Sequence, residues 1–243
     1  MAESRNTISN GLASGLLPSD VTMRKLKYFA PVLIAIACFG LQQAKADTFS
    51  FNLSVGNPAI SGYPGPYVSV TVNRTNSTHA TITFTSLTAA GNIYLVGDGS
   101  SVAVNVNATS WILSNITGSN SGTGFTPGPY SNGGSGNVDG FGVFNQNINS
   151  FDGFGHSSST IALALTNTSG TWANAAAVLA ANSGGSLAAA HIFVTVSPAN
   201  AANGALATGF AANGGQVPDG GTTVMLLGVA LGALGIVRRY ASG

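Results

Sequence analysis

Aspartate offers the clearest chemistry in this sequence, because its carboxylate can bind a metal ion or take part in proton transfer. Two similar pentapeptides, VDGFG at residues 138–142 and FDGFG at residues 151–155, place Asp139 and Asp152 in the same local setting. Asp-Gly pairs favour tight turns, which predicts a strand over residues 143–150 between two turns. The alternative is a calcium site built from Asp139, Asp152 and loop carbonyl oxygens. No Asp-x-Asp spacing supports it, so both are weak metal candidates and we expect neither a metal nor a cofactor.

Catalytic patterns are scarce. The only glutamate is Glu3, so a carboxylate pair for glycoside hydrolysis would have to come from the aspartates of the predicted domain. These are Asp47, Asp98, Asp139 and Asp152. No G-x-S-x-G, G-x-G-x-x-G or P-loop pattern occurs. The histidines lack metal-type spacing; we expect His191 to be packed in a core strand and His79 and His156 to face solvent in turns. We therefore predict no catalytic residue and a non-enzymatic protein, with a polysaccharide hydrolase as the third hypothesis.

The aromatic residues support a binding hypothesis. Trp111 and Trp172 flank segments rich in asparagine, serine and threonine. Aromatic faces beside amides and hydroxyls can hold sugar rings by apolar stacking and hydrogen bonds. A carbohydrate-binding module with glycan contacts at Trp111 and Trp172 is thus the second hypothesis. The alternative, which we favour, is that both tryptophans pack in the core or at its rim.

Composition narrows the class of protein. Only 6% of the 243 residues are charged, against about 25% in an ordinary soluble domain, and the formal net charge is +1. Nucleic acid is excluded as an expected partner, because binding to its phosphates needs a basic surface. A charge-driven disordered chain is also excluded, since such chains combine low hydrophobicity with high net charge.

The elements that would position these residues are strands with one buried face. Apolar and polar residues alternate with a period of two in TFSFNLSV, YVSVTV, ATITF, SVAVNVN, IALALT and HIFVTV. This pattern places Phe49, Phe51, Leu53 and Val55 on one face of the first strand, and Ile192, Val194 and Val196 on one face of the last. With turn-rich segments between them, these strands predict an all-β domain over residues 47–216, an antiparallel two-sheet sandwich or jelly roll. We expect one short helix over residues 171–182, where alanine is abundant.

The N-terminal region has the pattern of a secretory signal peptide over residues 23–46. Arg24, Lys25 and Lys27 precede an apolar run at residues 28–41, and Ala44 and Ala46 form a small-x-small cleavage site. Cleavage after Ala46 leaves Asp47 as the first mature residue. The signal peptide also predicts the secretion machinery as a partner. We expect residues 1–22 to be a spurious or unstructured extension, with a long leading region as the alternative. Acylation of Cys38 as a lipoprotein is a further alternative.

The C-terminal region, residues 217–243, has three ordered parts. The motif Val217, Pro218, Asp219, Gly220, Gly221 is followed by an apolar segment at residues 222–237 and then by Arg238 and Arg239. As a helix the apolar segment would span about 24 Å, close enough to a hydrocarbon core of about 30 Å to cross it with its flanks. The two arginines would stay in the cytoplasm, so the domain would be tethered outside.

This tail resembles the C-terminal sorting signal of the PEP-CTERM class, in its Val-Pro-Asp-(Ser/Gly)-Gly variant. Residues 151–194 and 203–211 also resemble members of that class. The resemblance implies export in a Gram-negative, biofilm-forming bacterium, transient membrane anchoring through the C-terminal helix and recognition by a membrane-embedded exosortase. It further implies association with exopolysaccharide at the cell surface or in the extracellular matrix. The leading prediction is therefore a non-enzymatic surface or matrix protein whose tail serves only as a sorting signal.

Overall fold

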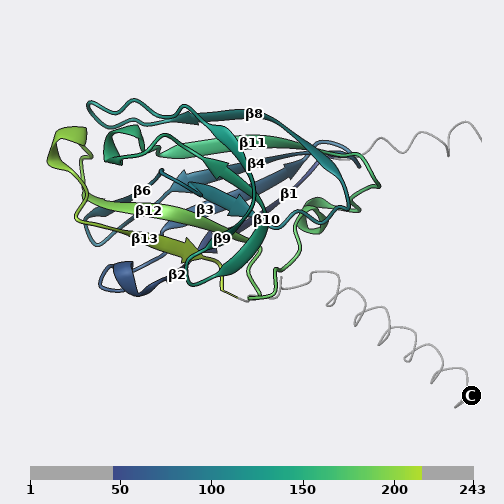
Figure 1. Ribbon diagram of the computed structural model, residues 1–243, viewed down its shortest axis with the longest axis horizontal. Helices are drawn as coiled ribbons and strands as arrows, with labels where there is room; N and C mark the ends of the chain where they lie inside the picture. The colour runs from purple at the N-terminus through teal and green to yellow at the C-terminus, as the bar shows by residue number, and fades with distance from the viewer. Residues whose placement is uncertain (1–45, 215–243) are drawn as a thin grey trace, which may run out of the picture. The chain divides into compact units, whose positions relative to one another are not determined.

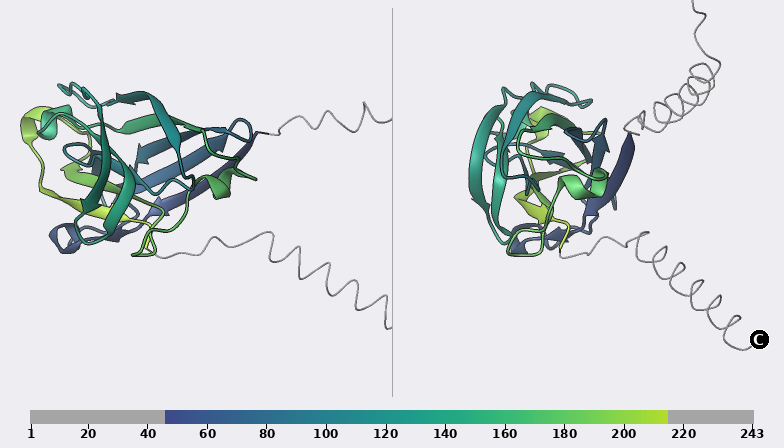
Figure 2. Two further views of the ribbon diagram at one scale, coloured as in Figure 1. Left: turned by 45° about the vertical axis from the view of Figure 1, so that its right-hand side comes forward. Right: turned by 90° about the vertical axis from the view of Figure 1, so that its right-hand side faces the viewer.

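The computed structural model of the protein describes residues 46–214 (Figure 1). Within this range the chain forms thirteen β-strands and four short 3-10 helices, and it contains no α-helix. The strands build two antiparallel sheets that pack as a sandwich, seen from two further sides in Figure 2. The all-β sandwich predicted from the alternating segments is confirmed.

The first sheet, called sheet A, has five strands in the order β1-β3-β4-β11-β8. Its pairing places core residues opposite one another, with Val70 opposite Phe84 and Ile82 opposite Leu163. Alternate residues of β3, β4 and β11 are buried, so one face lines the core and the other carries mainly hydroxyl side chains. The strands are β1 (Asp47–Leu53), β3 (Val68–Arg74), β4 (His79–Ser86), β11 (Thr160–Asn167) and β8 (Trp111–Ser119).

The second sheet, called sheet B, has eight strands, six of them in the order β2-β13-β12-β7-β10-β9. The remaining two form a hairpin beside β12, where β6 pairs with residues 192–196. The strands of sheet B are β2 (Val55–Gly56), β13 (Ala207–Ala212), β12 (Ala188–Val196), β7 (Val102–Val104), β10 (Gly142–Asn149), β9 (Ser131–Val138), β6 (Asn92–Val96) and β5 (Thr88–Ala89). The 3-10 helices are η1 (Pro58–Ile60), η2 (Phe154–His156), η3 (Ala175–Val178) and η4 (Ala201–Asn203).

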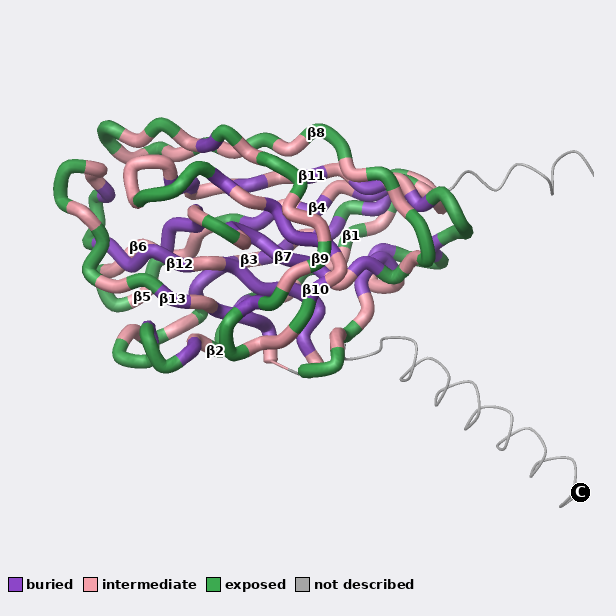
Figure 3. Tube along the Cα trace, in the orientation of Figure 1, coloured by how far each residue is buried: buried purple, intermediate pink, exposed green. Residues whose placement is uncertain are grey.

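The main core lies between the sheets and follows the predicted faces closely (Figure 3). Buried residues at alternate positions include Val68, Val70, Val72, Ile82, Phe84, Val102, Val104, Val106, Ile161, Leu163, Leu165, Ile192 and Val194. Two predicted core residues are exceptions, since Val55 is 48% exposed and Val196 is 43% exposed. Val55 falls in β2, after β1 has ended, and Val196 is the last residue of β12, so neither lies over the sandwich interior.

The helix predicted for residues 171–182 is wrong. Only η3 forms there, and Leu179 already has an extended backbone, with φ −113° and ψ 149°. The segment hydrogen-bonds to the chain after β7 instead of to itself: the Ala180 N–H donates to the Asn105 carbonyl at 2.9 Å, and Leu179 bridges to Val106. Both Val178 and Leu179 are buried, and an extended chain lets these neighbours each find apolar contacts. Tertiary packing therefore overrides the helix propensity of alanine.

The predicted strand between the two Asp-Gly turns is confirmed as β10. Gly140 has φ 83°, a conformation that glycine adopts readily, in the turn that joins β9 to β10. No helix among residues 46–214 is long and apolar enough to cross a membrane. The predicted extension, the signal peptide up to residue 45, and the sorting signal at residues 217–243 lie outside the described residues.

Candidate functional site

The aspartates of the two similar pentapeptides lie apart. Asp139 follows β9, ahead of β10, and its Oδ2 accepts a hydrogen bond from Nδ2 of Asn57 at 3.2 Å. Asp152 lies beyond the other end of β10. A strand of this length is over 20 Å long at about 3.3 Å per residue. The structure therefore does not bring Asp139 and Asp152 to one calcium ion, and no group of three or more histidine, cysteine or acidic side chains suited to a metal occurs within residues 46–214.

Asp152 meets Asp98 instead, which the sequence did not indicate. A hydrogen bond with Asp98 and the charge of that carboxylate raise the pKa of Asp152, which is exposed to solvent. Asp98 has φ 68°, a left-handed conformation in which its Oδ1 accepts from the Gly99 N–H at 2.9 Å. The Ser150 N–H donates to the Asp98 carbonyl at 3.1 Å, which ties the two loops together. The pair is held by backbone contacts between loops far apart in sequence.

His191 lies in the middle of β12 as a packed residue, as expected. Its ring stacks on Phe210 at 4.3 Å and on Phe193 at 5.4 Å between centroids. Its Nε2 is 2.8 Å from the hydroxyl of Thr208, and its Nδ1 is 3.3 Å from the Gly99 carbonyl. Burial lowers the pKa of His191, against a smaller opposing effect from Asp98. The imidazole therefore favours its neutral form.

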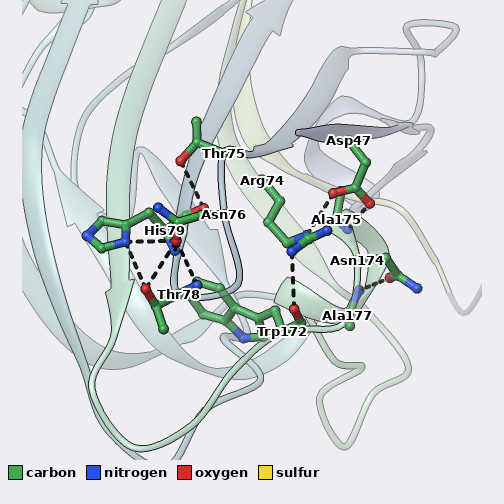
Figure 4. A network of polar contacts seen from close by, with 10 residues as sticks. All are labelled: Asp47, Arg74, Thr75, Asn76, Thr78, His79, Trp172, Asn174, Ala175 and Ala177. Atoms are coloured by element: carbon green, nitrogen blue, oxygen red, sulfur yellow. Dashed lines mark hydrogen bonds and ion pairs between the residues drawn. The ribbon is translucent and has the colours of Figure 1, made fainter. Parts of the chain in front are cut away.

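The other two histidines have local structural partners. His79 is exposed at the start of β4, and its Nδ1 is 2.9 Å from the Thr78 hydroxyl (Figure 4). His156 is partly buried in η2, with its Nδ1 2.8 Å from the Thr126 carbonyl and its ring 4.6 Å from that of Phe151. His156 thus anchors a loop, rather than facing solvent fully as expected.

The tryptophans are integrated into the sandwich. Trp172 is 2% exposed, and its indole N–H donates to the Asn107 carbonyl at 2.8 Å. Stacking of a sugar ring on Trp172, considered from the sequence, is therefore ruled out by burial. Trp111 is partly buried, and its indole N–H donates to Gln146 at 3.0 Å, which links β8 of sheet A to β10 of sheet B. The favoured interpretation, packing in the core or at its rim, describes both residues.

Asp47, the predicted first mature residue, belongs to a structural network (Figure 4). Arg74 donates from Nε to Asp47 Oδ1 at 2.7 Å, and the other carboxylate oxygen accepts from the Ala175 N–H at 2.6 Å. The Arg74 side chain is 10% exposed and the Asp47 side chain is 32% exposed, so the ion pair is shielded from water mainly on the arginine side. Asp47 therefore ties the start of β1 to β3 and η3.

A polar groove, called the amide groove, lies beside the ends of β7 and β11. Its volume is about 500 Å³, and it is lined by the segment after β7, by the end of β11 with the segment after it, and by Ala180. Its polar lining residues are Asn105, Asn107, Thr109, Asn167, Ser169 and Thr171. No site was predicted here, although the alternation SVAVNVN already places two asparagines opposite the buried valines. That asparagine pattern is a signal that could have suggested it.

The C-terminal segment joins the sandwich where β13 ends. Ala212 pairs with Val55 of β2, and the described chain stops at Gly214, two residues before Gln216. A protein-family model described as VPDSG-CTERM motif matches residues 216–239. The tail is a PEP-CTERM-type sorting signal.

This PEP-CTERM-type signal gives the protein its destination. It indicates an exported, cell-surface protein that an exosortase-type enzyme processes. The match includes the predicted motif Val217 to Gly221 and the basic pair Arg238 and Arg239. No curated protein and no solved structure matches the chain.

Proposed function

We propose that this chain is a non-enzymatic surface or extracellular-matrix protein that associates with exopolysaccharide. This association follows recognition and cleavage of its C-terminal tail by the processing enzyme. The observation that carries the proposal is the sorting signal at residues 216–239, attached to an exported β-sandwich. Such a signal delivers a domain to the cell surface and supplies no chemistry of its own. The functional contribution after delivery then rests with the sandwich.

The contacts of the candidate catalytic side chains support a non-enzymatic role. Asp47 pairs with Arg74, Asp139 accepts from Asn57, and His191 is stacked between phenylalanines. These contacts hold strands and loops together. The outer face of sheet A carries mainly threonine, serine and asparagine, and such groups exchange hydrogen bonds readily with a hydrated polysaccharide.

The test of delivery is a replacement of the sorting motif in the native host. Changing Pro218→Ala together with Asp219→Ala should leave precursor in the membrane and remove the domain from the surface and matrix fractions. Asn137→Ala, an exposed change in β9, is the matched control and should be delivered normally. Intact mass of the protein recovered from the surface reports both cleavages and any attached glycan. Equal delivery of the motif variant and the control would contradict the proposal.

Association with exopolysaccharide is tested separately by sedimentation. The protein released from cells should sediment with the polysaccharide of its own host and return to the supernatant after enzymatic digestion of that polysaccharide. A protein that stays in the supernatant throughout would contradict the matrix role.

The second candidate is a carbohydrate-binding module, which the amide groove favours. Its residues offer amide and hydroxyl groups in an open concave site of about 500 Å³. This alternative moves the glycan contact from the tryptophans to the groove.

The third candidate, a polysaccharide hydrolase, now rests on Asp98 and Asp152, the one carboxyl pair that meets in the described chain. Digestion of host polysaccharide by the purified protein, lost in Asp152→Asn, would overturn the non-enzymatic proposal in favour of this one. We expect no turnover by either form.

A further inference from the structure

The amide groove lies where a strand of each sheet ends. Residues 105–109 follow β7 of sheet B, and residues 167–171 comprise the last residue of β11 of sheet A and the segment after it. We propose that this groove binds a neutral polysaccharide segment, an inference that rests on the proposed association with exopolysaccharide and assigns it a site. The arrangement of hydrogen-bonding groups, the absence of charge in the lining and the fixed floor each support this ligand class.

Two asparagines present fixed acceptors to the groove. Nδ2 of Asn105 donates to the Ala180 carbonyl at 3.1 Å, and Nδ2 of Asn107 donates to the Ala177 carbonyl at 2.9 Å. These bonds orient each amide and leave its Oδ1 with no partner among the described residues. The groove thus offers two oriented acceptors for ligand hydroxyl groups.

Asn167 contributes a hydrogen-bond donor to the groove. It is 6% exposed, yet it lines the groove. Its Oδ1 accepts from the backbone N–H of Ser169 at 3.1 Å and from that residue's hydroxyl at 3.4 Å. Its Nδ2 has no hydrogen-bond partner within residues 46–214 and is not one of the fully buried atoms that lack a partner, so it is accessible to solvent and can donate to a ligand.

The floor and walls of the groove are held in place before any ligand arrives. Val106 is 3% exposed, and its backbone is clamped by the side chain of Asn145, which accepts at 2.7 Å and donates at 2.9 Å. Trp172 lies buried beneath and bonds to the Asn107 carbonyl. A site fixed in this way loses little conformational entropy on binding, which favours affinity.

The absence of charge in the lining selects the ligand class. None of the described residues that line the groove is ionisable. A carboxylate or sulfate placed there would lose water without gaining an opposite charge, which is unfavourable. Sugar hydroxyl groups both donate and accept, so they match the open amide oxygens, the Asn167 donor and the hydroxyls of Thr109 and Thr171. An uncharged sugar chain therefore fits this site better than an acidic one.

Calorimetric titration of the full-length protein in detergent micelles tests the proposal. The probes are cellohexaose and chitohexaose as neutral oligosaccharides, and an alginate hexamer as the acidic one. We expect binding of at least one neutral probe and none of the acidic probe. Thr171→Trp, at an exposed lining position, should fill the groove and weaken binding about tenfold or more. Thr117→Trp, at an exposed position of β8 away from the groove, should bind as the unchanged protein does.

A second variant guards against a purely steric effect. Asn167→Asp keeps the shape of the side chain and replaces the open donor with an acceptor, so it should also weaken binding. An unchanged far-ultraviolet spectrum would show that this variant is still folded.

If neither neutral probe binds, or if Thr171→Trp and Thr117→Trp bind equally, the groove proposal is wrong. Sedimentation of the same variants with host polysaccharide separates the two ideas: unaltered co-sedimentation would then leave the matrix role standing with another contact surface. Probe binding at the groove without co-sedimentation would instead contradict the matrix role.

Discussion

Sheets A and B share one core but differ on their outer faces. In sheet A the outer positions of β3 and β4 are exposed or partly exposed hydroxyl and amide side chains, and Ser50 and Thr71 exchange a cross-strand hydrogen bond at 3.1 Å. In sheet B the outer face is itself covered. Ala103, Ala189 and Ala212 pack with Val138 and Phe144 in a second apolar cluster.

A third cluster continues the cover on sheet B. Phe193 and Leu95 project outward and are covered by loop residues, with Phe154 5.7 Å from Phe193 and Phe125 5.1 Å from Phe154 between ring centroids. Nearly all of β12 is buried as a result. An antiparallel sheet with one wet face shows clean alternation, whereas a sheet covered on both faces does not. The strands of sheet A are therefore easier to predict from the sequence pattern than those of sheet B.

The largest loss of stability is expected from a charge placed in the core between the two sheets. Phe84→Asp would place an unpaired carboxylate in the core, at a residue with 0% exposure. The cost of several kcal/mol for the charge, added to the lost aromatic packing, approaches the whole stability of about 5–15 kcal/mol of a typical domain. The full-length variant should lose its β-type circular dichroism and its cooperative melt. Thr85→Asp, one residue later on the wet face, should keep both; similar behaviour of the two variants would mean that the face assignment of sheet A is wrong.

Strands were predicted correctly from the sequence where one face of the sheet is exposed to solvent. Strands β1, β3, β4 and β11 of sheet A and strands β7 and β12 of sheet B were predicted, because large apolar residues alternate there with small or polar ones. Strand β8 of sheet A was not predicted. The outer cover of sheet B was not predicted, because small alanines such as Ala103 and Ala189 give no polarity signal. The helix over residues 171–182 was wrong for a related reason: Val178 and Leu179 are buried, and the segment pairs with the chain that follows β7.

Site prediction was limited by contacts between distant segments. Asp98 and Asp152, or Asn105 and Asn167, are far apart in sequence and meet only once the loops are placed. Neither pair forms a local motif. By contrast, the sorting signal is contiguous, so its residues could be recognised without any fold.

A matched pair of leucine substitutions tests the difference between the outer faces. Ala189→Leu on sheet B should cost about 1–3 kcal/mol, because the extra carbons enter a covered cluster at a residue with 0% exposure. Thr83→Leu on the outer face of sheet A should change stability by about 0.5 kcal/mol or less. Thermal melts of the full-length proteins measure this at about 2–4 °C per kcal/mol for a domain of this size. Equal melting temperatures would show that the cover over sheet B is loose.

The buried histidine of sheet B should make the stability of the protein depend on pH. Burial lowers the pKa of His191 in the folded state, so below the unfolded pKa of about 6.5 the unfolded chain binds a proton that the folded chain resists. Stability should therefore fall as the pH drops from that value toward the lower folded pKa, with Asp98 opposing the loss. Melting temperatures between pH 7.5 and pH 5 should decrease by a few degrees, and His191→Gln should flatten the slope.

One control identifies the source of that slope. Asp152→Asn should retain it, since the raised pKa of Asp152 acts on stability with the opposite sign. A slope that survives in His191→Gln would assign the titration to another group.

The smallest change in stability is expected at two residues with a left-handed backbone conformation, one in each sheet. Ala90 has φ 49° in the two-residue turn between β5 and β6 of sheet B, followed by Gly91 at φ 81°. A turn with positive φ at both central residues favours asparagine or glycine, and alanine there is strained by about 1–2 kcal/mol. Asn115 has φ 50° at an irregularity of β8 in sheet A, and asparagine adopts that conformation with much less strain.

Replacing each of these two residues by glycine should therefore give unequal results. Ala90→Gly should stabilise the protein by up to about 1 kcal/mol, because relief of strain outweighs the added freedom of the unfolded chain. Asn115→Gly should lie within about 0.5 kcal/mol of the unchanged protein, since little strain is relieved there. The exposed position of Ala90 excludes a packing explanation for the gain. Thermal melts of the two full-length variants under one condition provide the comparison, and a lower melting temperature for Ala90→Gly than for Asn115→Gly would contradict the assigned turn geometry of sheet B.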